Sequence, residues 1–191
     1  MTIYQMGPLK QRRSRQILRG VVLVSLLVLM GNVSITQVQA QADEYQVKAA
    51  FIFNFAKFVD WPGDAFSDGG SLVVGVVGDD PFGGALDRLN GSAVNGRRLR
   101  IKRLRLGDNL RDCHILFISK SEGRNLGKIL DSIKGTSVLT IGEMPQFNQS
   151  GGMIRFVIQN SKVRFEINAA AAAQAHVRIS SKLLALSKGG N

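Results

Sequence analysis

The sequence predicts an α/β fold: a single domain with a mixed, mostly parallel sheet that is flanked by helices and carries a C-terminal antiparallel hairpin. Apolar runs of strand length alternate with segments of helical spacing, and this alternation favours parallel strands joined by crossover helices. Residues 153–167 alternate apolar and polar side chains on both sides of Asn160-Ser161, which is typical of two antiparallel strands and their turn. A chain of this length can bury one compact core.

The first 40 residues have the three parts of a secretory signal peptide in the expected order. Cations between Lys10 and Arg19 precede an apolar run at residues 20–35, and Val38-Gln39-Ala40 supplies the small residues of a cleavage site. We expect cleavage after Ala40, with Ala42 as the alternative site. The apolar run is short for a bilayer span, so an uncleaved anchor is the second interpretation. The mature domain, residues 41–191, is not expected to span the membrane.

The charge of the mature domain is modestly positive. The full chain has 25 Lys and Arg against 14 Asp and Glu. Five of the cations lie in the leader, so residues 41–191 keep 20 against 14, a net charge of +6. Nucleic acid is an improbable partner because the domain is expected to be exported, and the positive excess then favours anionic lipid headgroups, an acidic wall polymer or an acidic protein surface.

Residues 43–60 have the pattern of an amphipathic helix that is stopped by Trp61-Pro62. Its stripe consists of Val47, Phe51, Phe55 and Phe58, with Ile52 and Val59 on its flank. A stripe at helical spacing faces a core in most proteins, so core packing is the first interpretation. Phe53, Asn54 and Trp61 fall outside the stripe, and we predict that they belong to a partner or dimer surface.

A strand followed by a helix is predicted next. Residues 72–77 are apolar, as expected for a strand covered on both faces. Asp80 is expected to cap a helix whose first residue is Pro81 and which ends near residue 90. The turn Gly78-Asp79-Asp80 lies at the carboxyl end of the strand, where open α/β sheets bind ligands, and is the candidate small-ligand turn. Its carboxylates disfavour a phosphate there.

Residues 97–105 form the densest basic run, and most of them fall in a strand that is expected over residues 99–106. In a strand, Arg98, Arg100 and Lys102 point to one side. Cations on a peripheral strand discourage edge-to-edge aggregation, which is the first interpretation. An acidic partner or a membrane surface is the second. The run contains no aromatic residue, so it lacks the stacking platforms of a single-strand nucleic-acid binder.

Residues 113–119 and 137–141 read as strands with a helix at residues 125–133 between them. Cys113 is the sole cysteine, so the chain cannot close an intrachain disulfide. Inert packing is expected for Cys113, with an intermolecular bridge or a redox role as the alternative.

The chain offers little material for catalysis. Cys113 and His114 are neighbours in a strand and point to opposite faces, so they cannot act as nucleophile and base. His176 has no carboxylate near it in the sequence. Two histidines and one thiol are poor material for a metal site. We therefore predict no catalytic residue, no metal and no cofactor, and we do not expect an enzyme.

The C-terminal segment is expected to be helical. Asn168 caps a helix over residues 169–175, whose small side chains allow close packing against a neighbour. A last short helix is expected over residues 178–184, with Ser180 near its cap. Arg178 and Lys182 in this segment complete the predicted partner or dimer surface.

Four motifs in order resemble the YfiR-like family of periplasmic regulators (YfiR/HmsC-type). They are KAAFIFNFAKFVDWP from Lys48, VVGDDPFGGAL from Val76, CHILFIS from Cys113, and IRFVIQNSKVRFEIN from Ile154 followed by the alanine run and RISSKLL. Together they span nearly all of residues 43–187. Members of the family that use cysteine pairs can be stabilised by oxidation. Cys113 has no partner cysteine in this chain, which puts that property in doubt here.

The resemblance implies a periplasmic regulator that binds the periplasmic sensory domain of an inner-membrane protein, a diguanylate cyclase or kinase. In the cyclase case it would repress cyclic-di-GMP synthesis, and it would be a homodimer. The alternative function is a periplasmic small-ligand binding module that feeds a membrane sensor, with the turn Gly78-Asp79-Asp80 as its site.

Overall fold

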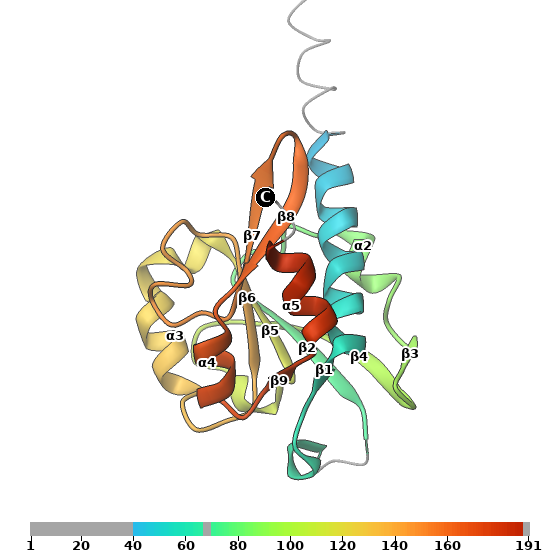
Figure 1. The fold of residues 1–191 in the computed structure, drawn as a ribbon, viewed down its shortest axis with the longest axis vertical. Helices are drawn as coiled ribbons and strands as arrows, with labels where there is room; N and C mark the ends of the chain where they lie inside the picture. The colour runs from blue at the N-terminus through green and yellow to red at the C-terminus, as the bar shows by residue number, and fades with distance from the viewer. Residues whose placement is uncertain (1–39, 67–69, 189–191) are drawn as a thin grey trace, which may run out of the picture. The chain divides into compact units, whose positions relative to one another are not determined.

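The computed structural model describes residues 40–66 and 70–188, and residues Glu44–Asn191 form one compact unit. Among the described residues, seven strands form one sheet in the order β3-β4-β2-β5-β6-β7-β8, and β1 and β9 form a second sheet (Figure 1). The strands are β1 (Val59–Asp60), β2 (Leu72–Val77), β3 (Ala93–Val94), β4 (Arg97–Leu104), β5 (Ile115–Ile118), β6 (Leu139–Gly142), β7 (Ile154–Gln159), β8 (Lys162–Ile167) and β9 (Arg178–Ile179). The α-helices are the N-terminal helix (residues 40–58), α2 (Gly84–Asp87), α3 (Leu126–Ser132), α4 (Ala169–Gln174) and α5 (Ser181–Lys188). Short 3-10 helices span Gly63–Phe66, Leu110–Asp112 and Lys120–Asn125.

The sheet is mixed and mostly parallel, as predicted. β2 pairs in parallel with β4 and β5, and β5, β6 and β7 continue in parallel, whereas β3–β4 and β7–β8 are antiparallel. The β7–β8 hairpin pairs Phe156 with Phe165, and its turn residues Asn160 and Ser161 have φ of 50° and 57°. Both values suit a two-residue hairpin turn of type I′. The predicted hairpin is confirmed.

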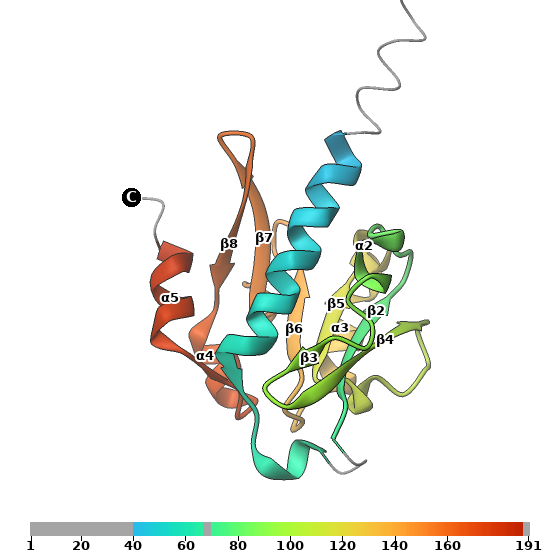
Figure 2. The ribbon, with the colours of Figure 1, turned by 90° about the vertical axis from the view of Figure 1, so that its right-hand side faces the viewer.

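Two hydrophobic clusters cover the two faces of the sheet. The first joins the N-terminal helix, α2, α4 and α5 to the β-strands, and Figure 2 shows the N-terminal helix crossing the sheet. The second cluster contains α3 and Phe147, together with alternate residues of β2 and β5. Cys113 lies in the second cluster. Strands covered on both faces explain why β2, β5 and β6 are buried along their whole length.

The buried face of the N-terminal helix differs from the predicted stripe. Its buried residues are Tyr45, Lys48, Ala49, Ile52, Phe55 and Ala56. Val47 is 45% exposed, and Phe51 and Phe58 are half-buried at the margin of the core. Core packing therefore holds for Phe55 and for the two flanking residues Ile52 and Val59, and Phe51 and Phe58 pack against the core from its margin. Only Val47 lies outside the predicted core face. The pattern did not place Lys48 on the buried face because lysine counts as polar, yet Glu143 neutralises it in the folded protein.

The helix predicted after β2 is shorter than expected. α2 spans only Gly84–Asp87, and Gly83 before it has φ of +53°. Asp80 does not cap this helix; its Oδ1 accepts a hydrogen bond of 2.8 Å from the N–H of Phe82, which forms a local turn. Asp80 and Pro81 therefore belong to the connection and not to the helix, because Gly83 interrupts the helical backbone.

The second sheet was not predicted. β1 and β9 are two residues long and pair Val59 with Ile179 and Asp60 with Arg178. Residues 178–179 were expected to begin the last helix, which in fact begins at Ser181. Ser180 does cap it, since its Oγ accepts from the N–H of Leu183 at 3.3 Å.

Candidate functional site

A groove lies beside the small β1–β9 sheet, and it is the candidate functional site. Its volume is about 660 Å³, within the range of protein binding sites. Most of its lining is apolar. The lining residues are Asp60, Trp61, Pro62, Ala169, Ala172, Ala173, His176, Val177, Arg178, Ile179 and Leu184. We call this hollow the β1–β9 groove.

Trp61 is fixed at one side of the groove by contacts with His114. The indole N–H of Trp61 donates to the backbone carbonyl oxygen of His114 at 3.2 Å. The Trp61 ring also meets the His114 ring edge to face at a centroid distance of 6.1 Å. Phe66 stacks on His114 at 4.3 Å. These contacts fix Trp61 in a half-buried position, and the residue still lines the groove.

The imidazole of His114 is neutral and has one defined tautomer. Its Nδ1 accepts from the N–H of Val73 at 3.1 Å, so Nε2 carries the proton and donates to the carbonyl oxygen of Ala65 at 3.0 Å. Burial lowers the pKa of His114 below its ordinary value, the charge of Arg97 lowers it further, and the bond to Ala65 opposes both effects. The residue is part of the support of Trp61.

The other side of the groove is the end of α4. Asn168 caps the start of α4 by accepting from the N–H of Ala171 at 3.1 Å. At the end, Val177 donates to the carbonyl of Ala172 at 2.9 Å and His176 to that of Ala173 at 3.0 Å, which is a Schellman motif. His176 has φ of +56° at the position where glycine is usual. The exposed His176 side chain thus lines the groove at some conformational cost.

A family model described as YfiR/HmsC-like matches residues 45–188. The chain belongs to the YfiR/HmsC-like family. The resemblance noted in its sequence is confirmed. The family is periplasmic in general, and its members are regulators of diguanylate cyclase signalling rather than enzymes. No protein of curated function matches the chain.

Two of the five predicted surface residues meet in the groove of this YfiR/HmsC-like chain. Trp61 and Arg178 both line it, because the pairing of Asp60 with Arg178 brings the two segments together. Phe53, Asn54 and Lys182 are not among its lining residues. Asn54 and Lys182 are exposed elsewhere. Phe53 is half-buried, with the Lys57 ammonium 4.3 Å from its ring centroid.

Sequence reasoning missed His176 and Ala173 as groove residues. The only available signal was the alanine run at residues 169–173, whose small side chains permit close approach. The alanine run does not indicate which segment of the chain packs against it. The groove depends on a contact between β1 and β9, which are more than a hundred residues apart and too short to be recognised as strands.

The candidate ligand turn is closely packed in the YfiR/HmsC-like fold. The N–H of Asp79 donates to the Oγ of Ser121 at 2.9 Å, and a Cβ added at Gly78 would lie 2.5 Å from the same oxygen. Asp80 accepts from the guanidinium of Arg103 at 2.9 Å. The backbone N–H of Asp79 and the carboxylate of Asp80 therefore already have protein partners, and a small ligand at this turn stays a prediction.

Cys113 is buried, with 3% of its surface exposed. Burial raises the pKa of its thiol to about 11. A Cβ added at Gly75 would lie 2.6 Å from the Sγ atom, so the thiol is in tight contact with β2. A protonated, enclosed thiol reacts slowly, which favours the packing interpretation over the redox one.

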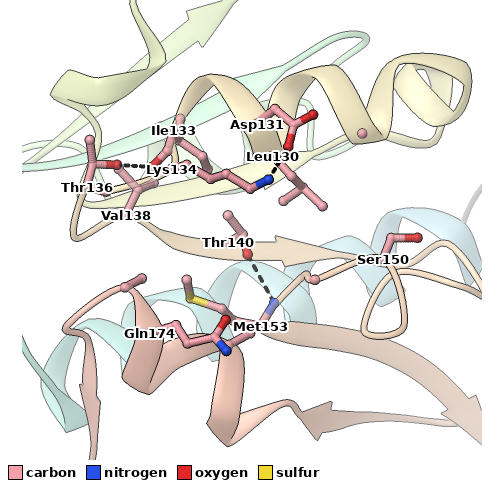
Figure 3. A pocket seen from close by; sticks show the side chains of 15 residues that line it. Leu130, Asp131, Ile133, Lys134, Thr136, Val138, Thr140, Ser150, Met153 and Gln174 are labelled. Carbon is pink, nitrogen blue, oxygen red and sulfur yellow. Dashed lines mark hydrogen bonds and ion pairs between the residues drawn. The ribbon is translucent and has the colours of Figure 1, made fainter.

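A second hollow of about 220 Å³ lies between α3 and α4 (Figure 3). Several of its polar groups are used by the fold. Thr140 Oγ1 accepts from the N–H of Met153 at 3.0 Å, and Lys134 pairs with Asp131 at 2.6 Å. It is smaller than typical ligand sites, so we place the candidate site at the β1–β9 groove.

Within residues 40–66 and 70–188, no group of three or more His, Cys, Asp and Glu side chains gathers in a way that could hold a metal ion. Within the same residues no helix has the length and apolar character to cross a bilayer. The predicted signal peptide falls on residues 1–40, of which 1–39 lie outside the described part of the chain.

Proposed function

We propose that this chain is exported to the periplasm, loses residues 1–40, and represses an inner-membrane diguanylate cyclase by binding its periplasmic sensory domain. Repression lowers cyclic-di-GMP signalling. Membership of the YfiR/HmsC-like family supports regulation of this pathway. The single observation that supports binding at a defined place is the β1–β9 groove, where Trp61 and Arg178 lie together.

The groove has the character of a protein-binding site. Its alanine and branched aliphatic lining supplies an apolar centre, and Trp61 and Arg178 are of the residue types that dominate binding energy at interfaces. Asp60 and His176 at the same groove offer polar contacts to a partner. An apolar segment of the sensory domain is therefore the expected occupant.

Repression follows if the chain binds the inactive form of the cyclase more tightly than the active form. To move a cyclase from one part in a hundred inactive to ninety-nine parts in a hundred, the affinity difference must be about 5.5 kcal/mol. The free energy gained by burying a few large apolar side chains of the partner in the groove is of this order. No reactive group is needed for such a mechanism.

The test is the cyclic-di-GMP level of the native bacterium after deletion of the gene and complementation. Ala173 is exposed and lines the groove, so Ala173→Arg blocks the groove without disturbing the core. Ala170 is exposed on the same helix and lines neither hollow, so Ala170→Arg is the matched control. Deletion should raise cyclic-di-GMP, and wild type and Ala170→Arg should restore it.

Ala173→Arg should fail to restore the level although it is exported in equal amount. Unchanged cyclic-di-GMP after deletion would refute the proposed pathway, whereas full repression by Ala173→Arg would refute the groove as the contact. The resemblance also implies a homodimer, and sedimentation of the exported protein should then give twice the mass of the mature chain.

A further inference from the structure

Nearly all of the net positive charge of residues 41–191 lies in one short segment. Residues 97–112 hold seven Lys and Arg against two Asp. The remainder of residues 41–191 holds 13 Lys and Arg against 12 Asp and Glu, which is almost neutral. The positive field of the mature domain is therefore local and is centred on β4.

Three cations form a straight row on β4. Arg98 and Arg100 are exposed and Lys102 is half-buried, and because strand residues alternate, all three point away from the side on which Leu99 enters the core. Their spacing along the strand is about 7 Å. None of the ion pairs among the described residues includes them. We call these three residues the cationic row.

Arg103, on the other side of β4, behaves differently. Its guanidinium pairs with Asp80 at 2.9 Å and with Asp87 at 2.5 Å. The cation on the α2 side of the strand is thus neutralised within the protein, whereas the cationic row is not. The edge strand of the sheet is β3, which pairs with β4 at Arg97 and Arg98, so protection of a free edge does not account for the cation at Arg98.

An exposed apolar side chain follows the cationic row. Leu106, two residues after the end of β4, is 47% exposed and stands between Arg105 and Gly107. Leucine and cations also occur together in helices that lie at membrane surfaces, where the leucine enters the boundary of the acyl chains and the cations meet the headgroups. A soluble polyanion would gain nothing from Leu106.

We propose that the cationic row and Leu106 form a docking surface for the anionic headgroups of a lipid bilayer. A leaflet presents phosphates in two dimensions, so a straight row of cations meets headgroups in any register. A protein partner would need an apolar centre, which the row lacks. Single-stranded nucleic acid would need aromatic platforms, which residues 97–105 also lack. The surface is separate from the β1–β9 groove and does not depend on the identity of the cyclase.

The experiment uses the exported protein, purified from the periplasmic fraction, and sedimentation with vesicles. Vesicles of phosphatidylcholine alone are compared with an equimolar mixture of phosphatidylcholine and phosphatidylglycerol. We expect binding to the mixed vesicles only, at an ionic strength of about 0.1 M and not at about 1 M, where charges are screened within about 3 Å. Each cation near an anionic surface contributes about fivefold to the partition coefficient.

The variant Arg98→Gln, Arg100→Gln, Lys102→Gln should therefore lower the partition coefficient about a hundredfold. The matched control is Lys162→Gln, Arg164→Gln, Lys182→Gln, which removes the same charge from exposed positions on β8 and α5 and should lower it only a few-fold. Because Lys102 is half-buried, Arg98→Gln, Arg100→Gln serves as a second variant, with an expected loss of about twenty-five-fold. Leu106→Ser should weaken binding without changing its salt dependence.

If the triple variant of the cationic row and its matched control lost the same factor in partition coefficient, the docking surface would be refuted. Net charge alone would then explain binding. Absence of binding to the mixed vesicles would refute it as well. If the row variant kept vesicle binding but lost binding to the sensory domain of the cyclase, the row would be a protein contact and the membrane proposal would be wrong. None of these results decides the groove proposal, which is tested separately by Ala173→Arg. That variant leaves all three residues of the cationic row in place.

Discussion

Lys48 on the N-terminal helix and Glu143 directly after β6 form an ion pair that is almost completely shielded from solvent. The exposed fractions of their side chains are 2% and 4%. Tyr45 donates to Glu143 Oε1 at 2.7 Å, and Lys120 lies 3.3 Å from the same oxygen. Burial alone would raise the pKa of Glu143, but the hydrogen bonds from Lys48 and Tyr45 and the two ammonium charges outweigh it, so the pKa lies below its ordinary value. The pair ties the helix to the carboxyl end of the sheet.

Replacing Lys48 by Met should lower the free energy of unfolding by about 3–5 kcal/mol, because it leaves the Glu143 carboxylate buried without its main partner. Adding Glu143→Leu should recover much of the loss. The control is Lys134→Met, which breaks the exposed pair with Asp131 and should cost less than about 1 kcal/mol. Urea unfolding measures all three. Equal losses for Lys48→Met and the control would show that the buried pair does not stabilise the fold.

His114 should make the protein less stable in mild acid. Its folded pKa lies below the ordinary value of 6.5, so the unfolded chain binds more protons as the pH falls below that value. The stabilisation is complete above pH 6.5 and is lost as the pH falls toward the folded pKa. Urea midpoints should therefore drop between about pH 7.5 and about pH 5, and less so in His114→Gln. His176→Gln, which removes an exposed imidazole, is the control. A flat profile in the wild type would contradict the neutral, hydrogen-bonded imidazole.

Replacing His176 by Gly should separate stability from function. Glycine relieves the positive φ at the end of α4, a strain of about 1 kcal/mol, and part of that gain is offset by the greater freedom of the unfolded chain. We expect a free energy of unfolding equal to or slightly above that of the wild type, together with weaker repression in the complementation assay. Full repression by a stable His176→Gly variant would exclude the imidazole from the partner contact.

Cys113 should be unreactive in the folded protein. Its buried thiol, with a pKa of about 11, is protonated at neutral pH. A chromogenic thiol reagent should label it slowly in buffer and at once in denaturant, and electrophoresis without reductant should show no bridged dimer. Rapid labelling of the native protein or a bridged species would restore the redox role that was the alternative interpretation.

Those parts of the fold that depend on neighbouring residues could be predicted from the sequence. The run at residues 72–77 is β2 to the residue, and the β7–β8 hairpin follows from strict alternation around Asn160-Ser161. Asn168 and Ser180 cap α4 and α5 because a cap needs only the next three residues. Local chemistry was sufficient for each of these elements.

Features that depend on distant residues could not be predicted. Lys48 can be buried because Glu143, 95 residues away, accepts a hydrogen bond from its ammonium group. The β1–β9 groove exists only once Asp60 lies opposite Arg178. Trp61 and Arg178 could be named as surface candidates, but their common site could not. The bounds of α2 were mispredicted for a different reason. The residue type of Gly83 allows positive φ but does not show that the backbone adopts it there.

The most direct test of the account is calorimetric titration of the exported protein with the periplasmic domain of the cyclase whose deletion abolishes the rise in cyclic-di-GMP. The account predicts saturable binding by the wild type and by Ala170→Arg, and at least about tenfold weaker binding by Ala173→Arg, because the introduced side chain occupies the β1–β9 groove. Absence of binding by the wild type, or equal affinities for the two arginine variants, would contradict it.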